Sequence, residues 1–294
     1  MATQDVVFRG GALGLFGVLG LIALEGTLTR LLGPSIVPGI TLPAVDITVG
    51  SATVSLVVLV ATWRLLSWEG IDLSALGIGR SHAVPALLTV GLFFALLNII
   101  AAGLALAAGH PETIGYHWTV PPAEALVVLL IMFVLAGLLE ELLFRGYLQT
   151  KLAAVIGGGV RGISVSIVLA SLIFAAYHIP RIIVEGTPDE TTAVMYLAGL
   201  TVSGLVYGLL YEWTQNLWIP VFVHTAGNAP GTAGIVFVLS GGWPAWAVVG
   251  YQLAYLASIA AVVLAYRRCG RTHGFFPVWN DRRDTQLSAG GTAA

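Results

Sequence analysis

Five polar residues lie inside long apolar stretches of this sequence. They are Glu140, Glu141, His178, His224 and Asn228. A charged side chain in the middle of a membrane helix costs at least about 2.5–3.5 kcal/mol on insertion scales, so such residues are rare and usually functional. A carboxylate, two imidazoles and an amide on three separate helices are the groups that a hydrolase needs to activate water and to stabilise a transition state.

The two glutamates stand late in one apolar stretch, and Arg145 follows Glu141 by four residues. Residues four apart share a helix face, and Glu before a cation is the favourable order, so we predict an ion pair between Glu141 and Arg145. Consecutive residues diverge by about 100° around a helix, which turns Glu140 elsewhere, without a local cation. We therefore predict that Glu141 and Arg145 support the helix while Glu140 faces a reaction site. The structural alternative is that both carboxylates reach the membrane interface.

Two further patterns supply the imidazoles. Phe174 and His178 are spaced four apart at the end of one apolar stretch, just before Pro180, and His224 and Asn228 have the same spacing in another. Each pair therefore shares a helix face. As structural alternatives, His178 could be an interfacial histidine, and His224 and Asn228 could be polar contacts between packed helices. Polar packing between helices would explain Asn228 by itself. It explains less well why His224 and Asn228 both lie on one helix face.

Composition places the chain among all-α polytopic membrane proteins. Of its 294 residues, 57% are hydrophobic and 10% are charged, and the mean hydropathy is +0.91. A soluble chain is about 25% charged. The net charge of −2 predicts no nucleic-acid partner, and the single cysteine excludes an internal disulfide framework. Membrane lipid is thus the expected surrounding, and the site is expected in the interior of the helix bundle.

A membrane-spanning helix needs about 20 mostly apolar residues. Eight stretches qualify: Gly11–Leu32, Ile47–Leu66, Ala83–Ala108, Pro121–Leu152, Ile163–Ile179, Thr191–Trp213, Leu217–Leu239 and Trp243–Tyr266. We expect residues 1–120 to supply the first three helices, 121–266 to form the bundle that carries the site together with the eighth helix, and 267–294 to be a polar, disordered cytoplasmic tail.

Cationic residues concentrate in cytoplasmic loops of membrane proteins. If eight spans leave both termini in the cytoplasm, 11 of the 13 Lys and Arg residues lie on the cytoplasmic side, and only Arg30 and Arg181 lie outside. This split predicts that both termini are cytoplasmic. We expect a multi-pass protein of the plasma membrane.

Three other details of the spans lead to expectations. His178 closes a span that begins on the cytoplasmic side, whereas Glu140 is close to a cytoplasmic helix end. For the two to meet, the fifth span must be displaced toward the cytoplasm, with residues 180–190 in protein-lined space. Glu25 and Asn98, single polar groups in earlier spans, are expected to form interhelical hydrogen bonds.

Taken together, three motifs resemble the CAAX protease and bacteriocin-processing family, also called Abi or type II CAAX prenyl endopeptidase-like. Leu139–Tyr147 reads LEELLFRGY, Leu172–His178 reads LIFAAYH, and Phe222–Asn228 reads FVHTAGN. The resemblance covers roughly residues 122–240, and the three motifs together are specific.

Membership of this family implies an eight-helix intramembrane endopeptidase that acts on membrane-associated or lipidated peptides or proteins. The resemblance implies a catalytic set, and it implies supporting roles for Glu141, Arg145 and Phe174. The implied catalytic residues are Glu140, His178, His224 and Asn228.

Peptide hydrolysis by these groups could follow either of two mechanisms. In the first, Glu140 is the general base, one His orients the water, and the other His and Asn228 donate to the oxyanion, each donor being worth about 2.7–4 kcal/mol. In the second, Glu140, His178 and His224 hold one zinc ion, a known catalytic ligand set. The sequence lacks the H-E-x-x-H helix usual for zinc proteases, and Asn228 is a better oxyanion donor than zinc ligand. Both observations favour the metal-free mechanism, but the sequence leaves the zinc mechanism open.

Two other functions use the same residues. The chain could be a non-catalytic membrane scaffold or an immunity protein of the same fold, which should tolerate Glu140→Gln. A transporter with a buried carboxylate relay should have two repeated halves with helices broken by Gly or Pro, and no convincing internal repeat is present.

Overall fold

The structure is a computed structural model of the chain. It describes residues 8–36, 41–42, 47–113, 121–157, 159–186, 189–228 and 244–273. The elements in chain order are α1 (Gly11–Leu31), α2 (Gly33–Ile36), β1 (Thr41–Leu42), β2 (Ile47–Thr48), α3 (Val49–Trp68), the 3-10 turn η1 (Leu73–Leu76), α4 (Arg80–Ala107), the 3-10 turn η2 (Pro111–Thr113), α5 (Pro122–Met132), the π-helical η3 (Phe133–Leu138), α6 (Leu139–Glu141), the π-helical η4 (Leu142–Gln149), α7 (Thr150–Ile156), α8 (Gly159–Tyr177), α9 (Ile179–Glu185), α10 (Glu190–Thr214), α11 (Trp218–Asn228) and α12 (Ala245–His273).

The fold is that of an all-α polytopic membrane protein. Within the described residues, seven helical stretches are long and apolar enough to cross a membrane. They correspond to seven of the eight spans predicted from the sequence. The remaining span, Leu217–Leu239, begins as α11, and its residues beyond Asn228 lie outside the described part. Apart from the helices, β1 and β2 form a two-residue antiparallel pair.

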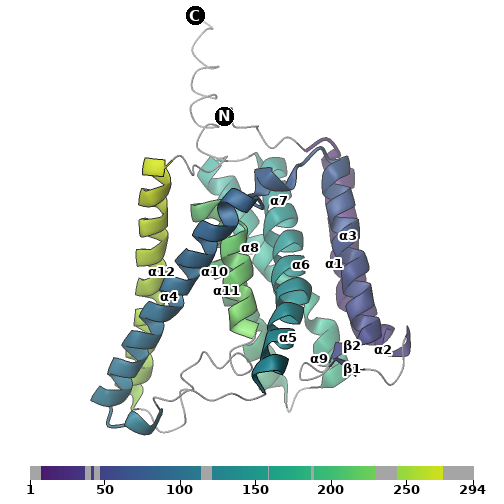
Figure 1. The fold of residues 1–294 in the computed structure, drawn as a ribbon. Helices are drawn as coiled ribbons and strands as arrows, with labels where there is room; N and C mark the ends of the chain where they lie inside the picture. The colour runs from purple at the N-terminus through teal and green to yellow at the C-terminus, as the bar shows by residue number, and fades with distance from the viewer. Residues whose placement is uncertain are drawn as a thin grey trace, which may run out of the picture.

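One continuous helical run, from α5 through η3, α6 and η4 to α7, forms the centre of the bundle (Figure 1). Every residue from Leu139 to Ala153 is buried. The surrounding helices α1, α3, α8, α10 and α11 all pack against parts of this run. A membrane helix covered on all sides by protein can carry ionisable groups away from lipid. The central run can therefore hold Glu140 and Glu141.

A buried ion pair ties the first helices to the central run. Lys151 Nζ lies 2.6 Å from Glu69 Oε1, and Tyr147 donates to the same carboxylate at 3.0 Å. The backbone amide of Gly10 donates to Glu69 Oε2 at 2.6 Å. From the sequence, Lys151 is expected at the cytoplasmic end of the fourth predicted span, among the cations on the cytoplasmic side. Its burial shows that the predicted segments 1–120 and 121–266 share one packed interior.

A tight turn sets α11 beside α10. Gln215 closes α10 in the left-handed region, with φ at 49°. The side-chain oxygen of Asn216 then accepts from the backbone N–H of Trp218 at 3.0 Å, which satisfies one of the unpaired amides at the start of α11. The Asn216 amide also donates to the Tyr266 hydroxyl at 2.9 Å. This turn places α11 next to the central run.

Glu25 and Asn98, the single polar groups of the earlier spans, form different kinds of hydrogen bond. Glu25 accepts a hydrogen bond from Ser55 of α3 at 2.9 Å, so its predicted interhelical bond is confirmed. The prediction for Asn98 is wrong, because its amide donates at 2.8 Å to the carbonyl of Phe94 in the same helix. An amide four residues after a helix carbonyl can satisfy itself locally without a neighbouring helix.

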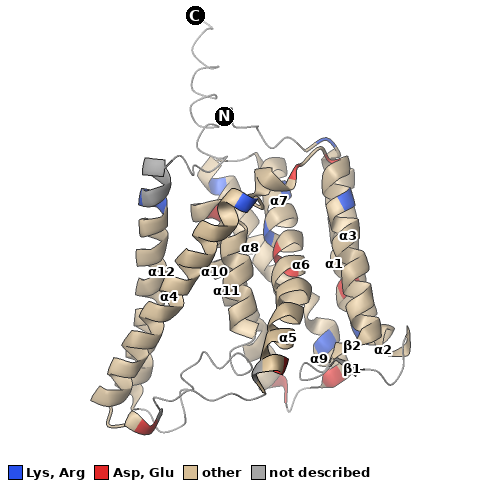
Figure 2. Cartoon of the chain, in the orientation of Figure 1, with Lys and Arg blue, Asp and Glu red and all other residues tan. Residues whose placement is uncertain are grey.

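Charge is unevenly distributed between the two ends of the bundle. Figure 2 shows Lys and Arg mainly at the end where α3 finishes and α4 begins, whereas Asp and Glu lie at both ends and in the middle of the bundle. At the opposite end from the start of α4, Arg30 and Arg181 both pair with Glu185, each at 2.7 Å. The two cations that the sequence analysis placed outside therefore lie together.

Helix α11 packs closely on the central run at Gly137, so a larger residue at this position should lower stability. A Cβ added at Gly137 would lie 2.2 Å from Thr225 Oγ1 and 2.9 Å from the Val221 carbonyl. Gly137→Ala should therefore push α11 away and lower stability by about 1–3 kcal/mol, the usual cost of overpacking. A melting curve of the purified protein in detergent measures it.

The matched control is Gly91→Ala on α4, where an added Cβ meets no atom within 4 Å. Alanine is the better helix former, so this variant should melt at or slightly above the wild-type temperature. Equal melting temperatures for the Gly137 and Gly91 variants would contradict the close contact.

Candidate active site

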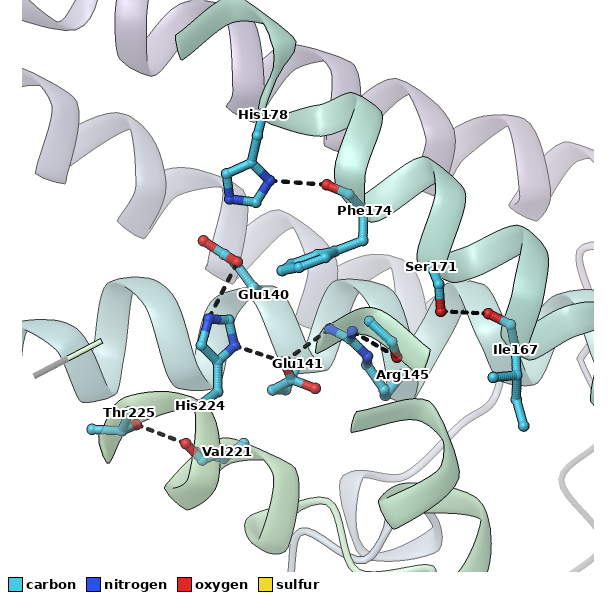
Figure 3. Close-up of polar contacts among 11 residues, drawn as sticks. Glu140, Glu141, Arg145, Ile167, Ser171, Phe174, His178, Val221, His224 and Thr225 are labelled. Atoms are coloured by element: carbon cyan, nitrogen blue, oxygen red, sulfur yellow. Dashed lines mark hydrogen bonds and ion pairs between the residues drawn. The ribbon is translucent and has the colours of Figure 1, made fainter. Parts of the chain in front are cut away.

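Three elements bring the predicted site residues together. Glu140 and Glu141 lie on α6, His178 follows directly after α8, and His224 lies on α11. Figure 3 shows the Glu140 carboxylate between the rings of His178 and His224. The convergence expected from the sequence is therefore present in the fold.

Glu141 joins two partners in the interior. Its Oε1 atom lies 2.8 Å from Arg145 Nη1, which is the predicted ion pair, and both side chains are almost fully buried. The same oxygen lies 2.7 Å from His224 Nδ1, a contact between residues 83 positions apart. Since a carboxylate can only accept, Nδ1 carries the proton in this contact. Glu141 thereby fixes the ring of His224 and turns Nε2 toward Glu140.

Arg145 is held on several sides. Its guanidinium donates to the backbone carbonyl of Gly204 at 3.2 Å. It also lies over the ring of Phe174, 4.6 Å from the centroid, and 5.3 Å from the ring centroid of Tyr207. Cation–π contacts of desolvated groups can each contribute about 2 kcal/mol. Arg145 is thus a fixed cation that compensates the charge of Glu141.

Glu140 has no comparable partner. Its Oε2 atom is buried, lies 3.7 Å from His224 Nε2 and has no hydrogen bond to a described residue. An unsatisfied buried carboxylate oxygen is costly, and native structures keep few such groups. Glu141 Oε2 is likewise buried without a hydrogen bond to a described residue, so the two glutamates differ in their other contacts: Glu141 Oε1 bonds to Arg145 and to His224 Nδ1, whereas Glu140 lies between the two histidines.

His178 is fixed through its own helix end. Its Nδ1 atom lies 2.9 Å from the carbonyl of Phe174. The ring packs edge-on against Phe174 and Tyr177, with centroids 5.0 and 4.9 Å away. Because Nδ1 bonds to a carbonyl, Nε2 is the nitrogen left for the site.

The expectation that residues 180–190 enter protein-lined space is wrong for their described helix. Pro180 opens α9 in its first turn, and α9 has no buried residue. Proline suits the first helical turn because it has no amide proton to satisfy there. A second short helix therefore follows His178, and it packs on α1 rather than entering the bundle.

Aromatic rings line the site. Phe174 lies edge-on to both His178 and His224, with centroids 5.0 and 6.0 Å away. Tyr207 of α10 stacks on His224 at 5.0 Å. The family resemblance implied a supporting role for Phe174 but gave none to Tyr207. Tyr207 stands between Gly204 and Gly208 of α10, and two small residues four apart are typical of close helix packing rather than of a reaction site.

Asn228 stands one turn after His224 at the end of α11, next to residues 229–243, which are not described. It is exposed, and its side chain makes no hydrogen bond to a described residue. Its predicted role as an oxyanion donor stays a prediction.

Wide π-helical turns flank the two glutamates, η3 before α6 and η4 after it. Such turns are rare and often occur at functional sites. Each contains a glycine at a close helix contact: Gly137 faces α11, and an added Cβ at Gly146 would lie 3.1 Å from Leu217. The glycines were visible in the sequence, but they did not predict π-helical turns.

The zinc mechanism requires Glu140, His178 and His224 to share one ion. No group of three or more His, Cys, Asp or Glu side chains in the described part of the chain is arranged to hold a metal ion. Nδ1 of His178 and Nδ1 of His224 are both engaged, and His224 Nε2 stands 3.7 Å from Glu140. Zinc bonds to nitrogen or oxygen are about 2.0–2.2 Å, so two ligands of one tetrahedral ion stand about 3.3–3.6 Å apart. The separation of 3.7 Å between His224 Nε2 and Glu140 Oε2 is close to that spacing, and the zinc mechanism considered from the sequence stays open.

Comparison with known proteins identifies the segment that carries the site. Residues 122–230 match the family described as type II CAAX prenyl endopeptidase Rce1-like. Over this segment, which is less than half of the chain, the protein is similar to the CAAX protease family. The family segment contains all the predicted site residues, from Glu140 to Asn228, while α1 and α3 lie outside it.

Among curated proteins, the chain is similar to the uncharacterized protein YpbD of Bacillus subtilis (strain 168). The two are 32% identical over 96 residues, which is 33% of this chain and 39% of that protein. No solved structure matches the chain.

Proposed function

We propose that this protein is an intramembrane endopeptidase in which Glu140 activates a water molecule for attack on a peptide bond. The observation that carries the proposal is the Glu140 carboxylate, buried, without a hydrogen bond to a described residue, and placed between two histidines whose rings are each fixed from behind. This arrangement is typical of a general base rather than of a structural carboxylate.

The proposed reaction gives roles to four residues, Glu140, His178, His224 and Asn228. Glu140 takes one proton from water as its oxygen attacks the scissile carbonyl carbon, and His178 orients the same water through Nε2. The carbonyl oxygen becomes an oxyanion, to which Asn228 donates. His224 donates from Nε2 in its doubly protonated form, since Nδ1 already donates to Glu141. Glu140 then passes its proton to the leaving amine, and the C–N bond breaks.

The substrate is a membrane-associated or lipidated peptide. Two observations support this class: the family is described as a CAAX prenyl endopeptidase family, and Glu140 lies within the membrane-crossing stretch Ala123–Ile156. A prenyl chain dissolves in the lipid beside the bundle and brings the peptide to the depth of the site.

The orientation proposed is that both termini lie in the cytoplasm and that the protein resides in the plasma membrane. Support comes from the concentration of Lys and Arg at one end of the helices (Figure 2), because cytoplasmic ends of membrane proteins are enriched in these residues.

The function is tested by comparing wild type with Glu140→Gln in two assays. The first uses a fluorescence-quenched farnesylated CAAX peptide with purified protein in detergent, and its control is the same peptide without the prenyl group. The second compares membrane proteomes of cells that express either form. A cut that only wild type makes supports the endopeptidase. If the two forms are identical in both assays, the non-catalytic scaffold or immunity protein is the correct alternative.

Asn228→Ala should lower kcat by about 10²–10³-fold, the usual loss for one oxyanion donor. The melting temperature should stay close to that of wild type, because Asn228 is exposed at the end of α11. Asn98→Ala is the control, since that amide bonds within its own helix. A wild-type kcat for Asn228→Ala would remove this residue from the mechanism.

Removal of divalent metals should leave cleavage intact. The reason is that no group of three or more His, Cys, Asp or Glu side chains among the described residues is arranged to hold a metal ion, and that Asn228 is a better oxyanion donor than zinc ligand. Activity and metal content are measured on one purified sample before and after treatment with a strong chelator and dialysis. Loss of activity that one zinc ion per chain restores would establish the zinc mechanism instead.

A further inference from the structure

A third buried glutamate lies close to the site but outside the family segment. Glu25 stands in the middle of α1 and is 4% exposed. Both of its carboxylate oxygens have partners: Ser55 of α3 donates to Oε1 at 2.9 Å, and the Tyr177 hydroxyl donates to Oε2. A carboxylate in a membrane helix is costly, so an apolar residue would serve better if α1 had only to pack.

The partner Tyr177 immediately precedes His178. Its ring lies edge-on to His178 with centroids 4.9 Å apart, and edge-on to Phe144 at 5.4 Å. The hydrogen bond from its hydroxyl to Glu25 fixes the far end of the ring. Tyr177 is therefore held between α1 and the central run, with one edge against the imidazole.

Helix α1 packs closely against Tyr177 at Gly26, where there is no room for a side chain. A Cβ added at Gly26 would lie 2.8 Å from the Tyr177 carbonyl oxygen and 2.9 Å from its Cδ2 atom. The end of α8 that carries His178 is thus packed against α1 rather than against lipid.

We propose that Glu25 is a positioning residue for His178, acting through the hydroxyl of Tyr177. The inference rests on the proposed endopeptidase function and adds α1 to the machinery of the family segment. His178 lies between α8 and α9, and within the described part of the chain its ring has one hydrogen bond, to the Phe174 carbonyl. Rotation of the ring about that bond is therefore restricted by neighbouring side chains. Tyr177 is the neighbour that Glu25 locks in place.

The test uses purified full-length protein and the farnesylated CAAX peptide, with kcat, KM and melting temperature measured for each variant. Glu25→Gln and Tyr177→Phe should each lower kcat by about tenfold to a hundredfold, because small displacements of a reacting group are that costly. KM should be nearly unchanged, since a group that acts in the transition state affects kcat. The double variant should lose no more than the stronger single variant, because both remove one hydrogen bond.

The matched control is Ser55→Ala, which removes the other hydrogen bond to Glu25 and leaves Tyr177 in place. Its kcat should be close to wild type. Wild-type kcat for Glu25→Gln or Tyr177→Phe, or additive losses in the double variant, would overturn the inference. If Glu25→Gln does not accumulate, Tyr177→Phe decides alone, because it keeps the ring and removes only the hydroxyl.

Glu140→Gln, measured in the same series, distinguishes failure of the proposed endopeptidase function from failure of the positioning role alone. Wild-type activity no higher than that of Glu140→Gln means that the protein does not cleave this peptide class, and the positioning role falls with it. Wild-type activity well above Glu140→Gln, with full activity in Glu25→Gln and Tyr177→Phe, means that only the positioning role is wrong.

Discussion

Glu140→Gln should lower cleavage of the farnesylated peptide by about 10²–10⁴-fold, the contribution usual for a general base. Glutamine keeps the size of the side chain but cannot take a proton from water. The protein should still fold, because Glu140 Oε2 makes no hydrogen bond to a described residue and its loss breaks no ion pair with Arg or Lys there. Initial rates per folded enzyme measure the effect, with abundance and melting temperature recorded in parallel.

The matched control is Glu124→Gln, an exposed glutamate in the first turn of α5 on the same helical run. It should leave both rate and melting temperature unchanged. Glu140→Asp shortens the side chain by one methylene and should recover part of the rate, since the base remains but stands further from the histidines. Turnover of Glu140→Gln equal to wild type removes Glu140 from the reaction.

Local spacing predicted the parts of the site that lie on one helix. The Glu141–Arg145 pair was foreseen because residues four apart on a helix meet wherever that helix lies. The His224–Glu141 contact was not foreseen, because it depends on how α11 packs on the central run. The sequence predicted that Glu140 and the histidines face one site, but not which carboxylate binds which ring.

Hydropathy predicted seven of the described spans for a similar reason: it measures each stretch by itself. It did not predict where a cation is buried. Lys151 looked like a helix-end residue, yet Glu69, from a connection 82 positions earlier, neutralises it in the interior. Nor did it predict the π-helical turns of η3 and η4, because helix propensity does not distinguish a π turn from an α turn.

Removing one member of the Glu141–Arg145 pair should have the largest effect on stability. Both side chains are 1% exposed or less, and breaking a buried pair leaves an uncompensated charge that costs about 3–5 kcal/mol. Glu141→Gln and Arg145→Met should therefore each sharply lower melting temperature and membrane abundance. Glu141→Gln also weakens the anchor of His224, so the enzyme that does fold should be slower than wild type.

A double variant separates the two roles of Glu141. Glu141→Leu with Arg145→Met removes both charges and keeps similar volume, and such replacements of buried pairs are often neutral for stability. We expect the double variant to regain most of the melting temperature lost by either single variant. It should not regain activity, because the ring of His224 then lacks the carboxylate that turns Nε2 toward Glu140. Recovery of both properties would mean that Glu141 only balances the charge of Arg145, and that the packing of Phe174 and Tyr207 suffices to orient His224.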